Sequence, residues 1–204
     1  MRILHVITSL RTGGAEKLMV DLLPRLKALG HEVDLCVFDG VRTPFYDEIE
    51  ARGIKVIALG HDAYSPRCIL QLARLMSGYD VVHSHNTSCQ YYVAIAGLVN
   101  RCKLFTTEHN TTNRRRSMKW RLLDRWMYGR YEKIVCITEL TMNNLLVHIG
   151  ERFAGRCKVI YNGIDLSAFR REKKAIPRIS DEKVVLMVSA FREQKDQKTL
   201  VRAM

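Results

Sequence analysis

Short apolar runs alternate with amphipathic stretches along almost the whole chain, and this alternation limits the folds open to it. The first run, Ile3–Ile7, is typical of a strand buried on both faces, and a helical period begins at Ala15. Further strands are expected at 31–38, 54–59, 79–85, 103–108, 133–138 and 158–161. Helices are expected between them at 15–29, 44–52, 66–76, 88–100, 117–131 and 139–149. This order favours an α/β fold with a doubly wound, mostly parallel Rossmann-like sheet.

The composition is that of an ordinary globular protein except in its charge. Of the 204 residues 47% are hydrophobic, enough for one large domain or one domain and part of another. No apolar run approaches the ~18 residues of a membrane span, and the first run is too short for a signal peptide. We therefore expect a cytoplasmic protein. The net charge of +12 predicts an acidic partner, such as anionic lipid or phosphorylated small molecules.

Polar residues gather where the expected strands end, and ligands bind at that edge in parallel sheets. Gly13 and Gly14 follow the first strand, where bare backbone N–H groups at a helix start can approach a phosphate. The fourth strand ends with His83 and His85, which its period of two places on one side, and the fifth ends with His109. Two histidines could contribute to a metal site, but we find no third ligand at a suitable spacing. No metal is therefore expected.

A change of composition near residue 170 predicts a domain boundary. Residues 171–182 are charged, contain Pro177 and show no period, so we expect a linker there. Lys183–Phe191 then predicts a new buried strand, and Asp196–Met204 a new helix. The expected organisation is one Rossmann-like domain over 1–170 and the beginning of a second, truncated unit over 183–204.

Short motifs along the chain resemble glycosyltransferase family 4, a family of retaining enzymes with the two-domain GT-B fold. The matching segments are Thr12–Glu16, Asp80–His85, Thr107–His109, Val159–Asp165 and Val188–Asp196. The resemblance covers essentially the whole chain. It implies that the first domain mainly holds the acceptor and the second the nucleotide-sugar donor, with no cofactor beyond these substrates. No Glu-x7-Glu pair is present, although the family's second domain uses that motif for the donor. We therefore expect residues 1–204 to be inactive alone.

The resemblance also implies roles for single residues. His109 would be the catalytic residue, lying beside the anomeric carbon and hydrogen-bonding the transferring sugar or the acceptor, for which imidazole is suited. The donor phosphates would meet Arg192 and Lys195, although many members carry Gly-Arg where this chain has Ser189-Ala190. The cleft-lining residues would be Gly13, Gly14, His85 and Asn162. Each has a structural alternative: a strand-end histidine bonded to backbone, solvated charges at a helix start, or glycines in ordinary turns.

The segment 114–133 is the feature most particular to this chain. It holds eight basic and two acidic residues, which is half of the net charge, interleaved with tryptophan, tyrosine and methionine. Such a mixture suits an anionic membrane surface, where aromatic rings lie at headgroup level. We expect the membrane-facing residues to be Arg114, Arg115, Arg116, Lys119 and Trp120. The alternative is an amphipathic helix packed on the sheet with solvated charges.

The sequence therefore predicts a glycosyltransferase that moves a sugar from a nucleotide-sugar donor to a saccharide or lipid-linked acceptor with retention. We expect the protein to be cytoplasmic and to associate peripherally with the inner face of the cytoplasmic membrane. The alternative is a non-catalytic acceptor- or membrane-binding module of the same fold. An oxidoreductase is disfavoured because the first turn lacks G-x-G-x-x-G. Nucleic-acid binding would explain the charge but not the histidines at the strand ends.

Overall fold

The computed structural model describes residues 1–61, 65–111, 117–166, 184–189, 191 and 195–204. The chain divides into two compact units, Met1–Asp165 and Leu166–Met204. The expected linker over 171–182, and the residues Arg114, Arg115, Arg116 and Arg192, lie outside the described residues.

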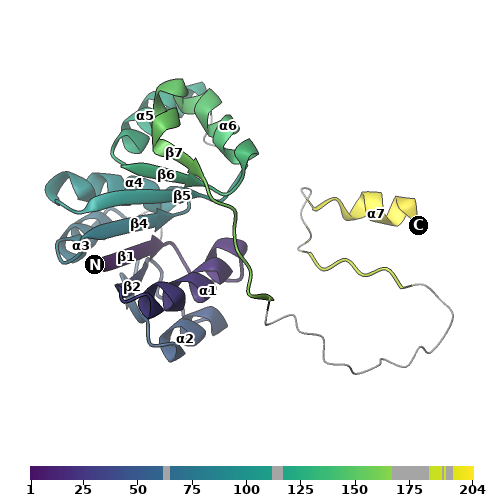
Figure 1. Ribbon diagram of the computed structural model, residues 1–204, viewed down its shortest axis with the longest axis horizontal. Helices are drawn as coiled ribbons and strands as arrows, with labels where there is room; N and C mark the ends of the chain where they lie inside the picture. The colour runs from purple at the N-terminus through teal and green to yellow at the C-terminus, as the bar shows by residue number, and fades with distance from the viewer. Residues whose placement is uncertain (62–64, 112–116, 167–183, 190, 192–194) are drawn as a thin grey trace. The chain divides into compact units, whose positions relative to one another are not determined.

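The described part of the first unit forms one parallel sheet of seven strands, in the order β3-β2-β1-β4-β5-β6-β7 (Figure 1). The strands are β1 (Arg2–Ile7), β2 (Glu32–Val37), β3 (Lys55–Ala58), β4 (Val81–His85), β5 (Lys103–Glu108), β6 (Lys133–Cys136) and β7 (Cys157–Val159). Chain order reverses between β1 and β4, as in a doubly wound fold. The α/β Rossmann-like expectation is thus confirmed.

Local chemistry explains where several of the helices begin or end. Thr43 caps α2 by accepting a hydrogen bond from the Tyr46 N–H at 3.2 Å, and Thr138 caps α6 through the Thr141 N–H at 3.1 Å. Gly30 follows α1 with a φ of 86°, a left-handed turn that favours glycine. The helices of this unit are α1 (Gly14–Ala28), α2 (Pro44–Ala51), α3 (Arg67–Met76), α4 (Thr87–Ala96), α5 (Arg121–Gly129) and α6 (Glu139–Ile149). Short 3₁₀ turns are η1 (Gly97–Val99), η2 (Met118–Trp120) and η3 (Glu151–Arg156).

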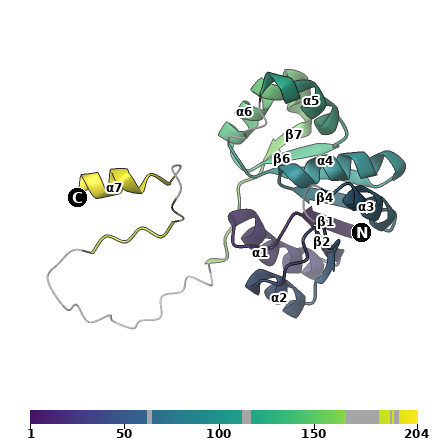
Figure 2. The ribbon, with the colours of Figure 1, turned by 180° about the vertical axis from the view of Figure 1, so that it is seen from behind.

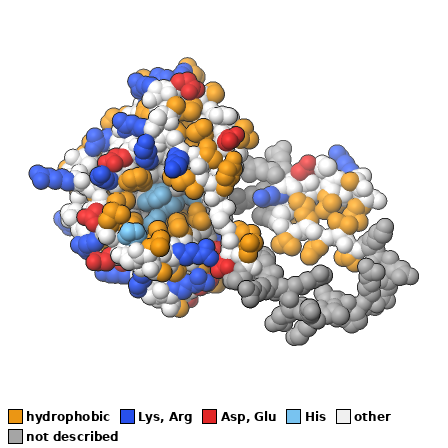
Figure 3. All heavy atoms as spheres, viewed as in Figure 1, with side chains coloured by type: hydrophobic (Ala, Val, Ile, Leu, Met, Phe, Trp, Pro, Cys, Tyr) orange, Lys and Arg blue, Asp and Glu red, His pale blue; other side chains and the backbone are white. Residues whose placement is uncertain are grey.

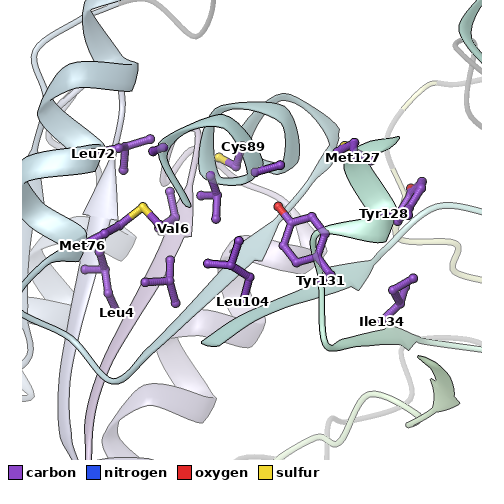
Figure 4. Packing of buried hydrophobic residues seen from close by; sticks show 14 of the residues in the cluster. Leu4, Val6, Leu72, Met76, Cys89, Leu104, Met127, Tyr128, Tyr131 and Ile134 are labelled. Atoms are coloured by element: carbon purple, nitrogen blue, oxygen red, sulfur yellow. The ribbon is translucent and has the colours of Figure 1, made fainter. Parts of the chain in front are cut away.

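Two hydrophobic layers lie on the two faces of the sheet. The smaller packs α1 and α2 against β1 and β2, through side chains such as Leu23 and Ile49. The larger packs α3, α4, α5 and α6 on the other face, which Figure 2 shows from behind. Figure 4 shows part of that layer, with Met76 of α3 close to Leu4 of β1. Because the helices divide in this way, β4–β6 keep side chains on the α1 face that no described helix covers.

A buried polar cluster joins the helices of the larger layer. The Asp124 carboxylate accepts a hydrogen bond from the Tyr91 hydroxyl and lies 2.6 Å from His148 Nε2. Asp124 and His148 are only 4% and 9% exposed, so this cluster connects α4, α5 and α6 out of reach of bulk water. Buried polar groups of this kind depend on their partners, since water cannot replace them.

Replacing Asp124 by asparagine should lower the free energy of unfolding by about 1–3 kcal/mol. The amide keeps the size of the side chain but removes one of the two acceptors that its neighbours use. Urea unfolding followed by circular dichroism would measure the loss. Asp47→Asn is the matched control, because Asp47 pairs with Arg42 at an exposed site and should change stability by less than about 1 kcal/mol. Equal losses in the two variants would contradict a special role for the buried cluster.

In the second unit, the expected helix is present but the expected strand is not. Helix α7 (Gln197–Ala203) follows Asp196, whose side chain accepts a hydrogen bond from the Thr199 hydroxyl at 2.7 Å. Residues 184–189 form no strand, and Val184 and Val188 are 88% and 87% exposed. The prediction of a buried strand was therefore wrong for these residues. A strand needs neighbours for its N–H and C=O groups, and no described residue supplies them.

Candidate active site

A groove of about 450 Å³ opens on the face of the sheet beside α1. Side chains of β1, β4, β5 and β6 form its floor, and one wall is the row Leu18, Leu22 and Leu26 of α1. The other wall is residues 160–163, which follow β7. Arg25 of α1 and Asp165 form an ion pair at 2.9 Å next to this second wall. Both side chains are about half exposed, so the pair adds little to the stability of the fold.

Three histidines meet on the floor of this groove, which we call the histidine groove. His5 of β1 lies opposite His83 of β4 in the sheet register, and His85 follows two residues later on the same side. The ring centroids of His83 and His85 are 4.4 Å apart, and those of His5 and His85 are 5.2 Å apart. Figure 3 shows histidine side chains gathered at the middle of this face, with hydrophobic side chains around them.

Hydrogen bonds connect the rings in a chain that reaches His109. His5 Nδ1 lies 2.9 Å from His85 Nε2, and His85 Nδ1 lies 3.2 Å from His109 Nε2. His83 Nε2 bonds separately to the Thr107 hydroxyl at 2.8 Å. Because a neutral imidazole has one donor and one acceptor nitrogen, the tautomers of His5, His85 and His109 fix one another.

Burial keeps these imidazoles uncharged at neutral pH. Loss of solvation lowers the pKa of His5 and of His109 to about 4. The pKa values of His83 and His85 are also well below the ordinary value, first through burial and then through the neighbouring histidines. Neutral imidazoles donate and accept hydrogen bonds, so this site can orient hydroxyl groups and does not act as a cationic site.

Two buried polar atoms in this region have no hydrogen-bond partner among the described residues: His5 Nε2, and Oδ1 of Asn86, which directly follows His85. Asn86 follows β4 with a φ of 73°, which is uncommon outside glycine, and its Nδ2 donates to the Thr8 hydroxyl at 2.8 Å. Strained residues with unused polar atoms cluster at functional sites. The sequence analysis did not single out Asn86, and it missed His5 because that residue lies inside an apolar run.

His5, His83 and His85 are also the described residues best placed to hold a metal. One ligand atom from each lies within 4.8 Å of the others. A tetrahedral zinc with bonds of about 2.1 Å needs its nitrogens about 3.4 Å apart. His5 Nδ1 and His85 Nε2 lie only 2.9 Å apart, closer than two nitrogens on one zinc ion, so the described geometry fits the hydrogen-bonded chain better.

The structure brings some of the expected site residues together and separates others. His85 and Asn162 line the histidine groove, and His109 contacts it through His85. Gly13 and Gly14 lie at the start of α1, outside the groove lining.

The glycine turn was expected to let a phosphate come close to the backbone. In the structure the side chain of Glu16 takes the space beside Gly13. A Cβ on Gly13 would lie 2.2 Å from Glu16 Oε2, because the Glu16 carboxylate turns back over the helix start. A Cβ on Gly14 would have no neighbour within 4 Å. Lys195 is exposed in the second unit.

The described part of the basic segment presents apolar side chains to solvent. Lys119 is exposed, and Trp120 and Trp126 are 47% and 39% exposed. Met127 and Tyr128 make the buried face of α5 instead. Among the described residues, no helix combines the length and hydrophobicity needed to cross a bilayer.

Several solved structures share the fold of this chain at low sequence identity. HepE from Anabaena, in complex with UDP and glucose, is 20% identical with a TM-score of 0.70, over 85% of this chain and 47% of its own. A glycosyltransferase from Rickettsia africae is 22% identical with a TM-score of 0.69, over 83% and 45%. A UDP-GlcNAc 2-epimerase from Neisseria meningitidis, bound to UDP-GlcNAc, is 17% identical with a TM-score of 0.55, over 79% and 47%. The chain thus spans about half the length of each of these proteins.

These likenesses establish the fold, which serves both transferases and epimerases and does not by itself fix a reaction. No curated protein matches the chain by sequence. The family profile is more specific, because it matches residues 12–168, which include His83, His85 and His109. The chain therefore belongs to Glycosyltransferase Family 4.

Proposed function

We propose that this chain is the acceptor-side domain of a retaining glycosyltransferase, joined to the beginning of its donor-binding domain. The complete enzyme would transfer a sugar from a nucleotide-sugar donor to a saccharide or lipid-linked acceptor. The observation that carries the proposal is the chain of neutral imidazoles at the carboxyl ends of β4 and β5, in a member of this family. Neutral imidazoles can hold sugar hydroxyls by hydrogen bonds without placing a charge in the buried site.

The family resemblance implies separate roles toward the donor for residues of each unit. His109 would hydrogen-bond the transferring sugar, and Lys195, with Arg192, would meet the donor phosphates. Positive charge there offsets the charge that develops on the departing nucleotide. Support for a nucleotide sugar comes from HepE, whose structures contain UDP with glucose, or UDP-glucose.

The proposed acceptor side includes the histidine groove and, for a lipid-linked acceptor, a membrane surface. His85 and Asn162 line the groove, which is mostly apolar with a few polar groups in its floor, a mixture that suits the faces and hydroxyls of a saccharide. Lys119 and Trp120 are exposed and would face anionic lipid on the inner side of the cytoplasmic membrane.

Residues 1–204 alone should release nucleotide from nucleotide sugars at no more than the background rate. Without a donor-binding domain the transition state lacks stabilisation of the leaving nucleotide, which is commonly the largest catalytic contribution. A panel of nucleotide sugars, assayed for nucleotide release with and without saccharide acceptors, would measure this. Robust turnover by residues 1–204 would contradict the two-domain proposal.

The non-catalytic alternative has its own test. The gene sequence past the codon for Met204 should encode a Glu-x7-Glu motif if the protein is a transferase. A longer reading frame without that motif would favour an acceptor- or membrane-binding module, to which the exposed Trp120 of η2 and Trp126 of α5 are equally suited.

A further inference from the structure

A second pocket, of about 450 Å³, lies where α5 meets η3. It is lined by four arginines and two aromatic side chains, and we call it the arginine pocket. Its lining side chains are Arg125, Arg130, Arg152, Arg156, Trp126 and Phe153. Guanidinium groups recognise phosphate through paired N–H donors, so a concave site with four of them suits a phosphate group.

Three of these arginines are held in place by the ends of helices. Arg125 Nε donates to the Ile149 carbonyl at the end of α6 at 2.7 Å, and Arg156 Nη1 donates to the Gly129 carbonyl at the end of α5 at 2.9 Å. Arg130 Nη2 makes a longer bond of 3.5 Å to the Gly97 carbonyl, just after α4. These bonds fix the stems and leave further N–H donors on each group.

The helix ends do not neutralise the pocket. Each carries about half a negative elementary charge, so three offset only about 1.5 of the four positive charges. Among the residues that the structure describes, none of the four guanidiniums pairs with a carboxylate. The pKa of Arg125 is lowered by loss of solvation and then by the charges of Arg121 and Arg152, which is the effect of unneutralised cations on one another.

Apolar side chains continue outward from the rim of the pocket. Leu122 lies one helical turn before Trp126 on α5, and these residues are 77% and 39% exposed. Trp126 lines the pocket as well as facing solvent. A cationic pocket beside exposed leucine and tryptophan differs from a site for a free soluble phosphate, because the apolar row would stay in water unless it entered an interface.

We propose that the arginine pocket binds the phosphate of an anionic phospholipid headgroup, with Leu122 and Trp126 entering the lipid interface beside it. The pocket adjoins the starts of β5, β6 and β7, because the helices whose ends it caps lead into those strands. His85 and His109 lie at the opposite edge of the sheet. The site is therefore separate from the proposed sugar-transfer site, and it deepens only the membrane contact of the proposed function.

Arg152→Gln is the cleanest test, because the only side-chain contact described for Arg152 is with the Phe153 ring, its guanidinium carbon lying 5.0 Å from the ring centroid. Co-sedimentation of residues 1–204 with phosphatidylglycerol/phosphatidylcholine vesicles at low salt should show binding about five-fold weaker than wild type. The double variant Arg125→Gln with Arg152→Gln should bind about 30-fold more weakly. Arg74→Gln, which removes the same charge from an exposed position on α3, is the matched control and should change binding less than two-fold. A melting curve for each variant confirms folding.

The possible outcomes separate the proposals. Equal losses of vesicle binding in Arg152→Gln and Arg74→Gln would show that the protein binds membrane through its overall charge. That result would overturn the proposed arginine pocket but would agree with a membrane-binding surface. If the wild-type protein does not bind anionic vesicles, both the arginine pocket and the membrane-binding surface are overturned. Stabilisation by inorganic phosphate without vesicle binding would assign the pocket to a free phosphate and overturn the lipid. None of these results bears on sugar transfer, which is measured by nucleotide release.

Discussion

Replacing His109 by alanine in the complete transferase should lower kcat by about 100-fold or more, the usual effect of removing one positioned group from a transition state. His109 Nε2 is engaged by His85 at 3.2 Å, which fixes the ring and leaves Nδ1 for a substrate hydroxyl. Burial lowers the pKa of His109 to about 4, so the ring stays neutral above pH 6. The loss should therefore be similar from pH 6 to pH 8.

Nucleotide release under saturating donor would measure this loss, with KM determined separately. Asn110→Ala is the matched control, because Asn110 is exposed and directly follows His109. The control should keep kcat within about two-fold of wild type, a difference of about 0.4 kcal/mol in the barrier. An unchanged kcat in folded His109→Ala protein would return His109 to the alternative reading, a structural histidine at a strand end.

Most of the fold could be predicted because its determinants are local. The period of the hydrophobic residues differs between strands and helices and can be recognised in short stretches of sequence. Capping residues such as Thr43 and Thr138 mark helix starts. Helix α5 was predicted to begin at Ser117, but Met118–Trp120 form a 3₁₀ turn first. Boundaries of this kind depend on packing that a short window does not contain.

The candidate site was predictable only where it lies at strand ends. His85 and His109 were found because parallel sheets place their carboxyl ends along one edge. His5 was missed because its role depends on the register that sets it opposite His83, and register is a long-range property. A histidine inside an otherwise apolar strand was the available signal, since a buried imidazole needs a partner.

The arginine pocket shows the same limit at a larger scale. Its arginines run from Arg125 to Arg156 and form no compact motif. They converge only because the ends of α4, α5 and α6 lie together in the fold. The basic segment contains Arg125 and Arg130, but it did not reveal a pocket completed by Arg152 and Arg156 from η3. Charge counted along a sequence does not show which cations share one surface.

Acidification from pH 7 to pH 5 should destabilise the first unit by about 4 kcal/mol, because its histidines are buried uncharged. In the unfolded chain a histidine takes up its proton near pH 6.5, whereas His5 and His109 in the folded protein do so only near pH 4. The unfolded state therefore binds more protons between these values, and the stability that is complete above pH 6.5 is lost as the pH falls. Each of these two histidines contributes about 2 kcal/mol over this interval, and His83 and His85 act in the same direction.

Urea unfolding at pH 7, 6 and 5, followed by circular dichroism, would measure this slope. His109→Gln should reduce the loss between pH 7 and 5 by about 2 kcal/mol, since it removes one of the titrating groups. His31→Gln is the matched control, because it removes a histidine that lies outside the cluster, between α1 and β2. Stability that stays level between pH 5 and 7 would mean that the imidazoles accept protons in the folded state. The histidine groove would then be a cationic site for acidic ligands, and hydrogen bonding by neutral rings could not be its means of holding a sugar.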